Sequence, residues 1–212
     1  VARFGQISDT GDLDGKIIKK KNKVNLNNID LKFLEDKYTG TIEQTPPMFS
    51  ALKHKGVPLY KYARKGITIK REPRNINIYK IELKLIDSNH MSINVVCSKG
   101  TYIRAIARDI GDILKCGGYL SKLIRTQQGC FNIEEAKNIS DISFDNIIPI
   151  SEAFPNLNSI KLDEFQTKNY INGGLVGIKK EIDEVVKIFS NEDKFLGLGL
   201  IKATGLKLKQ LV

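Results

Sequence analysis

Residues 97–129 read CSKGTYIRAIARDIGDILKCGGYLSKLIRTQQG, and this stretch decides the fold that the sequence predicts. Its middle part has the spacing of a helix, with apolar side chains at Ile103, Ile106, Ala107, Ile110, Ile113 and Leu114. Cys116-Gly117-Gly118 ends that helix. Two runs of alternating polarity, residues 76–86 and 91–96, precede it and predict a hairpin that turns at residues 87–90. The sequence therefore predicts a β-hairpin that leads directly into a helix.

The rest of the chain predicts shorter elements and a second domain. Residues 1–4 predict the end of a strand, residues 5–15 a Gly-rich loop, and residues 31–38 a helix with Asp30 as its N-cap. Residues 45–70 are irregular, with a helical turn over 59–64 and a short strand over 67–69. After residue 150, apolar runs at 185–189, 195–201 and 206–212 alternate with Gly and Asn turns. We therefore expect one domain over residues 1–150 and a small β-rich domain over 151–212.

The composition narrows the class of protein. The 212 residues carry 34 Lys+Arg against 24 Asp+Glu, a net charge of +10, which favours a polyanionic partner such as a nucleic-acid backbone. The three cysteines form no CxxC pair and the two histidines cannot make a multi-His site, so we expect no metal and a reducing, cytoplasmic setting. No apolar run reaches membrane-helix length, and no signal peptide is present, so we expect a soluble protein.

The start of the predicted helix carries two cations, Lys99 and Arg104, where the free N–H groups of a helix already favour an anion. An RNA phosphate or a buried carboxylate among these groups would explain them. The alternative is that both are ordinary surface residues. On the helical wheel, Arg104 flanks the apolar stripe, whereas Arg108 points away from it and is predicted to be solvated.

The loop over residues 5–15 holds three carboxylates, Asp9, Asp12 and Asp14. The full EF-hand pattern is missing, so a calcium site is not favoured. A turn stabilised by Asx side chains is the simpler interpretation. A more specific one is that one of these Asp residues pairs with Arg104.

The segment 45–74 interleaves cations with aromatic side chains. This pattern suits loop or single-stranded RNA, whose bases stack and whose phosphates need neutralising. A solvated loop with tyrosines as core anchors is the alternative, and the basic run 16–23 is weaker evidence still. The residues concerned are Lys53, His54, Lys55, Lys61, Arg64, Lys65, Lys70, Arg71 and Arg74, with Phe49, Tyr60 and Tyr62.

Residues 1 to about 135 resemble the TruB-type tRNA pseudouridine-55 synthases of bacteria. The resemblance rests on four stretches in this order: ARFGQISDTGDLDG (2–15), QTPPMFSALKHKGVPLYKYARKGI (44–67), REPRNINIY (71–79) and the stretch 97–129. It implies an α+β fold with a mixed, mainly antiparallel sheet flanked by helices, an RNA-clamping insertion at about 45–74, and a PUA-like domain after residue 150. It also implies a monomeric enzyme that isomerises a flipped-out uridine in the T loop of tRNA without metal or cofactor.

The resemblance also assigns roles to single residues. Arg104 matches the Arg that pairs with the catalytic Asp, and Asp12 matches an acidic position beside that Arg. Tyr102 and Leu123 match positions that line the uridine pocket, and Lys99 lies next to them. The residues expected to bind the T arm are Lys53, Tyr60, Tyr62, Arg64, Arg71, Arg74 and Arg125.

One departure affects the activity. In the family the catalytic Asp lies in a Gly-x-Leu-Asp-Pro motif, which is expected upstream of Val1 and does not occur in the 212 residues; Asp12-Leu13-Asp14-Gly15 is not that motif. The first hypothesis is therefore an enzyme whose catalytic Asp is outside this stretch, so that the stretch alone is inactive and poorly stable. The second is an RNA-binding remnant without catalysis. A third, an RNA chaperone, leaves Tyr102, Arg104 and Leu123 without a shared purpose.

Overall fold

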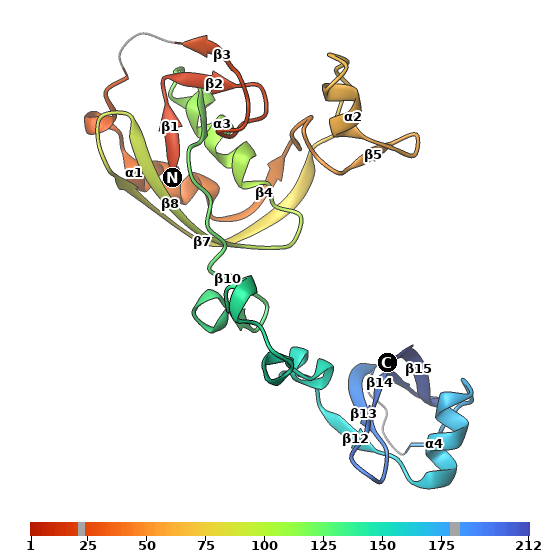
Figure 1. The fold of residues 1–212 in the computed structure, drawn as a ribbon. Helices are drawn as coiled ribbons and strands as arrows, with labels where there is room; N and C mark the ends of the chain where they lie inside the picture. The colour runs from red at the N-terminus through yellow and green to blue at the C-terminus, as the bar shows by residue number, and fades with distance from the viewer. Residues whose placement is uncertain (21–23, 179–182) are drawn as a thin grey trace. The chain divides into compact units, whose positions relative to one another are not determined.

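The computed structural model describes residues 1–20, 24–178 and 183–212, and the chain divides into two compact units, Val1–Ile124 and Arg125–Val212 (Figure 1). The boundary between these units lies earlier than the predicted domain boundary after residue 150. Residues 125–150 thus go with the second unit.

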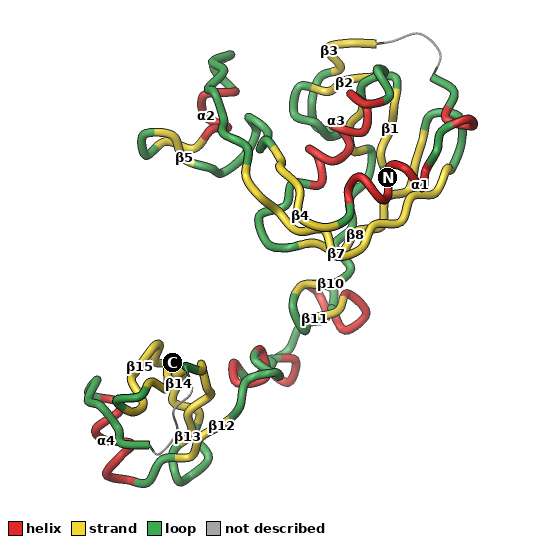
Figure 2. Tube along the Cα trace, turned by 180° about the vertical axis from the view of Figure 1, so that it is seen from behind, coloured by secondary structure: helices red, strands yellow, loops and turns green. Residues whose placement is uncertain are grey.

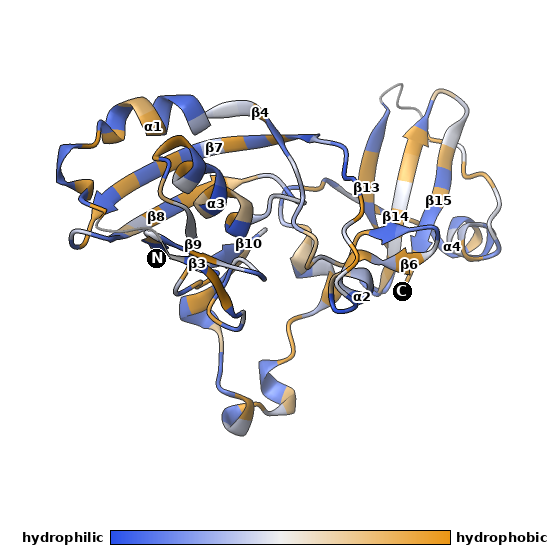
Figure 3. Ribbon diagram, turned by 90° about the horizontal axis from the view of Figure 1, so that it is seen from above, coloured by the Kyte–Doolittle hydropathy of each residue, from blue (hydrophilic) through white to orange (hydrophobic). Residues whose placement is uncertain are grey.

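The first unit is built on a five-stranded antiparallel sheet, in agreement with the predicted mainly antiparallel sheet. Its order is β4 (Gly40–Gln44), β7 (Arg74–Leu85), β8 (His90–Cys97), β1 (Ala2–Phe4), β9 (Gly118–Leu120). Hydrophilic and hydrophobic residues alternate along β7 (Figure 3). The predicted hairpin is confirmed as β7 and β8. Strand β1, the first along the chain, lies between β8 and β9.

Two helices cover one side of this curved sheet (Figure 2): α1 (Leu31–Tyr38) and α3 (Ile103–Ile113). Both predicted helices are confirmed, and the Asp30 carboxylate caps α1 by accepting from Phe33 N–H at 2.9 Å. Their apolar faces meet the sheet in a core that includes Ala2, Phe4, Leu34, Ile76, Ile78, Ile81, Leu83, Met91, Ile106, Ala107, Ile110 and Leu120.

Helix α3 packs against β9 so closely that one position must lack a side chain. A Cβ on Gly111 would lie 2.3 Å from the carbonyl carbon of Gly117 and 2.4 Å from the nitrogen of Gly118. Gly117, at φ 74°, makes the turn between helix and strand, and its N–H bonds the carbonyl of Gly111 at 2.9 Å. This approach fixes the helix on the edge of the sheet.

Short elements fill the connections of the first unit. Strands β2 (Gln6–Ser8) and β3 (Ile17–Lys20) form a hairpin where a loop was predicted over residues 5–15. Residues 21–23 of the basic run 16–23 lie outside the described residues. Strands β5 (Lys53–His54) and β6 (Val57–Pro58) lead into α2 (Leu59–Ala63), the predicted helical turn.

The predicted strand over residues 67–69 is wrong. These residues form no regular element. The Ile69 N–H instead bonds the sulfur of Met48 at 3.4 Å, so this part of the chain contacts Met48 rather than a neighbouring strand.

The second unit holds a four-stranded sheet in the order β12 (Ser159–Lys161), β13 (Glu184–Phe189), β14 (Phe195–Lys202), β15 (Gly205–Leu211), with β12 and β13 parallel. The three apolar runs predicted as strands lie in β13, β14 and β15. Helix α4 (Glu164–Ile171), which we did not predict, begins at a capping box made by Asp163 and Gln166. Its Tyr170 is buried in a core with Leu162, Val176, Val186, Ile188, Ile201 and Leu206.

Residues 125–158 contain short elements only: β10 (Gln127–Gln128), β11 (Phe131–Asn132) and four 3-10 turns at Ile133–Glu135, Ile139–Asp141, Phe144–Asn146 and Ile150–Ala153. Large apolar side chains lie exposed there, Ile139 at 92% and Phe144 at 90%. In residues 1–20, 24–178 and 183–212, no helix has the length and apolar character needed to cross a bilayer.

Gly111→Ala should lower the free energy of unfolding by about 1–3 kcal/mol, because the added methyl group overpacks the contact between α3 and β9. This loss should occur although Ala favours a helix over Gly by about 1 kcal/mol. Urea denaturation measures the change. Gly177→Ala is the matched control, because a Cβ there meets no atom within 4 Å. Equal stability of Gly111→Ala and wild type would contradict the close packing.

The turn between β7 and β8 predicts a pH dependence. The Asp87 carboxylate accepts from the N–H groups of Asn89 and His90, each at 2.8 Å, and contacts the His90 ring at 2.9 Å. The Asn89 hydrogen bond, and then the His90 ring, lower the pKa of Asp87 below its ordinary value near 3.8. A lowered folded-state pKa stabilises the protein above the unfolded value, and this contribution is lost as the pH falls through the folded value.

Asp87→Ala should therefore lower the melting temperature at pH 6, and the difference from wild type should shrink as the pH falls below about 4. Asp87→Asn, which keeps an acceptor oxygen but no charge, should be less destabilised than Asp87→Ala, but its difference from wild type should change with pH to the same extent, because neither variant titrates at this position. Melting curves followed by circular dichroism between pH 2 and 7 make the comparison. A deficit of Asp87→Ala that stays constant across this range would count against the carboxylate as its cause.

Candidate active site

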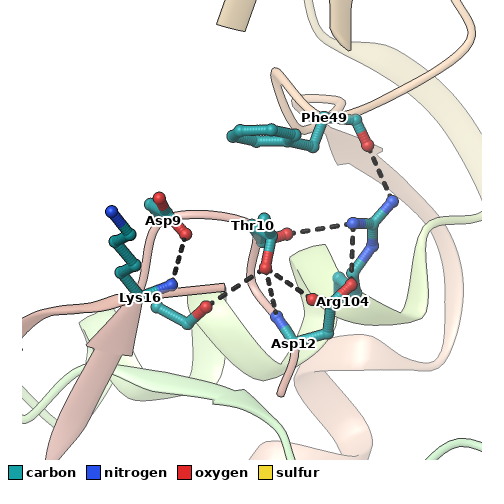
Figure 4. A network of polar contacts seen from close by, with 7 residues as sticks. Asp9, Thr10, Asp12, Lys16, Phe49 and Arg104 are labelled. Carbon is teal, nitrogen blue, oxygen red and sulfur yellow. Dashed lines mark hydrogen bonds and ion pairs between the residues drawn. The ribbon is translucent and has the colours of Figure 1, made fainter. Parts of the chain in front are cut away.

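Arg104, in the first turn of α3, is the centre of a network of polar contacts (Figure 4). Its Nη1 donates to the Thr10 carbonyl at 3.0 Å and to Oδ2 of Asp12 at 2.9 Å. Its Nη2 donates to the Phe49 carbonyl at 2.7 Å. The predicted pairing of Arg104 with one Asp of the Gly-rich loop is therefore confirmed, and the partner is Asp12.

The loop that carries Asp12 is held by its own side chains. The N–H of Lys16 donates to Oδ1 of Asp9 at 2.9 Å, so an Asp side chain closes the loop across seven residues rather than the two of an Asx turn. The Thr10 hydroxyl donates to the other carboxylate oxygen of Asp12. Gly11 has φ 80° and lies against Arg104, where a Cβ would be 3.5 Å from that of Arg104. The loop therefore presents the Asp12 carboxylate to the guanidinium in one orientation.

A buried amide side chain, Gln44 at the end of β4, holds the start of α3. Its Oε1 accepts from Tyr102 N–H at 2.8 Å, and its Nε2 donates to the Tyr102 carbonyl at 3.1 Å. Gln44 is 3% exposed. Because the Tyr102 side chain makes no capping bond, this double contact takes the place of a cap. Sequence reasoning missed Gln44, since its partner lies 58 residues away along the chain.

Arg108 is not free in solvent, and the prediction that it is solvated is wrong. Its Nη2 donates to the Thr45 carbonyl at 2.9 Å, and its Nε contacts Oδ1 of Asp109 at 2.7 Å. Arg104 and Arg108 are four residues apart on α3. Arg104 bonds the Phe49 carbonyl and Arg108 bonds the Thr45 carbonyl, so they contact the two ends of one segment. The two arginines thus hold residues 45–49 against the helix.

A cavity of about 410 Å³ opens beside Arg104. It brings together five of the predicted site residues, Asp12, Tyr60, Arg64, Tyr102 and Arg104, with Thr10, Asp14, Phe49, Ser50 and Ala51. The Arg64 guanidinium lies over the ring of Tyr60, 5.3 Å from its centre. The cavity therefore has aromatic rings on its walls and charges of both signs around it.

Other predicted site residues do not line this cavity. The Leu123 side chain is 61% exposed, and Lys99 is exposed in the turn before α3. Lys53 and Arg74 are exposed, and Arg125 bonds Gln128 in the second unit. Tyr62 packs edge-on against His54 at 6.0 Å. The roles predicted for these residues stay predictions.

Among the described residues, no group of three or more His, Cys, Asp or Glu side chains could hold a metal ion. The Asp12 carboxylate is already shared between Arg104 and Thr10. The groups that the described part of the site offers are a carboxylate–guanidinium pair, aromatic rings and hydroxyl groups.

Comparisons with known proteins agree with one another. The model of the family described as TruB family pseudouridylate synthase (N terminal domain) matches residues 1–103. The tRNA pseudouridine synthase B of Francisella philomiragia is 41% identical over 206 residues, which cover 92% of this chain and 67% of that protein. The tRNA pseudouridine synthase B of Clostridium tetani is 37% identical, and the match covers 99% of this chain and 75% of that protein. The chain thus spans about two thirds to three quarters of these relatives.

Among solved structures, the chain is similar to one chain of a Cbf5–Nop10–Gar1 complex, with a TM-score of 0.64 and 18% identity. The match covers 89% of this chain and 64% of that one. A second similar chain, with a TM-score of 0.62, comes from an H/ACA ribonucleoprotein bound to a substrate RNA. At this identity the likeness shows a shared fold.

The pairing of Arg104 with Asp12 can be measured by a double-mutant cycle. Arg104→Met and Asp12→Ala should each destabilise the protein. The double variant should lose less free energy of unfolding than the two single variants lose in sum. The difference should be about 1 kcal/mol, the size of a charged hydrogen bond in a partly exposed position. Urea denaturation of the four proteins gives this coupling. The same cycle with Asp14→Ala, whose carboxylate lines the cavity, is the control, and equal coupling in both cycles would contradict the assigned pair.

Proposed function

The chain belongs to the TruB family of pseudouridylate synthases, and from this premise we propose that it serves the conversion of uridine 55 in the T loop of tRNA to pseudouridine. In this isomerisation the C1′–N1 bond of the uridine breaks and a C1′–C5 bond forms. The proton on C5 is lost and N1 gains one, so nothing else is consumed. The observation that carries the proposal is the ion pair between Arg104 and Asp12, which lies beside a cavity lined by aromatic side chains.

The guanidinium of Arg104 has room for a second carboxylate. Three of its five N–H donors are used by Thr10, Asp12 and Phe49. One N–H on Nε and one on Nη2 have no other partner among the described residues. Such a pair of donors fits a carboxylate or phosphate by two parallel bonds. We infer that these donors orient the nucleophilic Asp that the family carries in its Gly-x-Leu-Asp-Pro motif.

The Asp12 carboxylate acts on Arg104 rather than on the uridine. By accepting from Nη1 and from the Thr10 hydroxyl, it fixes the plane of the guanidinium. The Phe49 carbonyl holds the other nitrogen. We infer that Asp12 is a positioning residue, because its contacts run through Arg104.

The walls of the cavity suit a flipped-out base. Tyr102 and Tyr60 both line it, and aromatic side chains stack on bases in RNA-binding sites. Arg64, stacked on Tyr60, brings a positive charge to the same wall. We infer that the uridine enters here and that the hairpin β5–β6 with α2 contacts the T arm around it. A monomeric, cytoplasmic protein that binds the tRNA T stem-loop is part of this proposal.

A second candidate function rests on one observation. The Gly-x-Leu-Asp-Pro motif does not occur in the 212 residues. A protein limited to these residues would bind tRNA through the same basic segment and catalyse nothing. The two candidates differ in one measurable quantity, which is the formation of pseudouridine once the motif is supplied.

The 212-residue protein should bind a T stem-loop RNA in a salt-sensitive manner and form no pseudouridine. A hybrid that carries the motif-bearing N-terminal part of the Francisella relative should form it, as detected by tritium release from [5-³H]uridine RNA. Arg104→Met in this hybrid should reduce turnover by at least about a hundredfold, because the Asp loses the donors that orient it. RNA affinity should change little.

Lys32→Gln in the hybrid is the control, since Lys32 pairs with Asp36 on the exposed side of α1. Full turnover of the hybrid with Arg104→Met would overturn the role of Arg104. A folded hybrid that binds RNA without any turnover would favour the second candidate.

A further inference from the structure

Gln44 holds both backbone groups of Tyr102 with one side chain. Its Oε1 accepts from the Tyr102 N–H at 2.8 Å, and its Nε2 donates to the Tyr102 carbonyl at 3.1 Å. Because Gln44 is buried, its amide needs partners in the protein to replace water. Both polar atoms of the amide have such a partner, and both partners belong to a single residue.

Two bonds to one residue restrict its backbone more than one bond would. Tyr102 is extended, with φ −96° and ψ 105°, and it directly precedes the first turn of α3. In an antiparallel sheet, a neighbouring strand holds a residue in the same way, through its N–H and its carbonyl. The amide of Gln44 therefore takes the place of a neighbouring strand. Since the backbone sets the direction of the Cα–Cβ bond, the Tyr102 ring can vary only by its side-chain torsions.

The chain just before Tyr102 offers no second anchor. The backbone groups of residues 99–101 make no hydrogen bond to any residue that the structure describes. After Tyr102 the helix itself takes over, because the N–H groups of Ala105 and Ile106 donate to the Tyr102 carbonyl at 3.0 and 3.3 Å. Gln44 is thus the contact that ties this end of α3 to the sheet through strand β4.

The same end of β4 leads to the contacts of the Arg104 network. Tyr102 and Arg104 both line the cavity. Phe49, five residues after Gln44, accepts from Arg104 at 2.7 Å, and Arg108 bonds the carbonyl of the residue that follows Gln44. The segment that begins at Gln44 is therefore joined to α3 at three points. These contacts keep the Tyr102 ring and the Arg104 guanidinium in one mutual position on the cavity wall.

We propose that Gln44 is a positioning residue, which sets the place of the Tyr102 ring in the cavity that takes the flipped-out uridine. This inference rests on the proposed function. Gln44 is not among the described residues that line the cavity, so it acts through Tyr102. An amide is suited to this task because it carries a donor and an acceptor on one planar, uncharged group. Met has a similar length and can make neither bond.

The first arm of the test follows Tyr102 in the 212-residue protein without RNA. Labelling with 3-fluorotyrosine gives ¹⁹F signals, and Tyr102→Phe identifies the signal of Tyr102. Gln44→Met should shift and broaden this signal, because the ring is no longer held in one place. The signal of Tyr170, which is buried in the core of the second unit, is the internal reference. Asp30→Ala is the matched control, since it destabilises the first unit by removing the cap of α1 and should leave the Tyr102 signal unchanged.

A second measurement needs no variant, so it decides the contact even if Gln44→Met does not fold. The side-chain amide protons of Gln44 in wild type should exchange with solvent at least about a hundredfold more slowly than those of the exposed Gln128. Nuclear magnetic resonance spectra resolve these protons. Equal exchange rates of the two amides would contradict the bonds between Gln44 and Tyr102.

The third arm measures turnover in the hybrid that carries the motif-bearing N-terminal part. Gln44→Met should lower kcat about tenfold or more, because a displaced ring misplaces the uridine relative to Arg104. KM for the T stem-loop should stay within about twofold, since the change affects the reacting geometry rather than the binding of the RNA. Asp30→Ala should keep both values near those of the unmodified hybrid.

The arms separate this inference from the proposed function. A Tyr102 signal that Gln44→Met leaves unchanged would overturn the inference, and an active hybrid would leave the proposed function standing. A signal that moves, with a kcat that falls no further than in Asp30→Ala, would also overturn it, because the place of the ring would not matter for turnover. An unmodified hybrid without turnover would instead refute the proposed function, and the ¹⁹F signals would still show whether Gln44 fixes Tyr102.

Discussion

The guanidinium of Arg104 joins three segments that are far apart in the sequence, and the arrangement of the site depends on this contact. It ties the 9–15 loop, through Thr10 and Asp12, and the 45–49 segment, through Phe49, to the start of α3. A charged group with several donors in fixed directions can do this where an apolar contact could not, since each bond sets an angle as well as a distance. The loop, the helix start and the 45–49 segment therefore keep one mutual geometry.

Features with a regular period could be predicted from the sequence. The β7–β8 hairpin follows from the alternation of apolar and polar residues, and α3 from its apolar stripe, because each pattern indicates burial on one face of a single element. The pairing of Arg104 with an Asp of the Gly-rich loop was also predicted, because a cation at a helix start calls for an anion. The second sheet was predicted for the same reason, from short apolar runs between turns.

Contacts across long distances along the chain could not be predicted in this way. The helical wheel placed Arg108 in solvent because it considers one helix and ignores the Thr45 carbonyl that lies against it. Gln44 gave no signal, since a Gln at the end of a strand is ordinary until its partner at Tyr102 is known. The strand predicted over residues 67–69 is wrong because alternation over three residues does not specify a strand without a neighbour to pair with. Here the Ile69 N–H bonds the Met48 sulfur instead.

The place of β1 inside the sheet has a consequence for how the protein is made. Ala2 and Arg3 pair with β8 on one side and β9 on the other, so their hydrogen bonds need residues 90–91 and 119–120. During synthesis at roughly 5–20 residues per second, the first strand has to wait several seconds for its neighbours. Pairing between strands so far apart in the sequence is slow, because closing the long loop between them costs conformational entropy before any stabilising contact forms. The nascent chain thus passes through a period in which the buried face of β1 is open to chaperones.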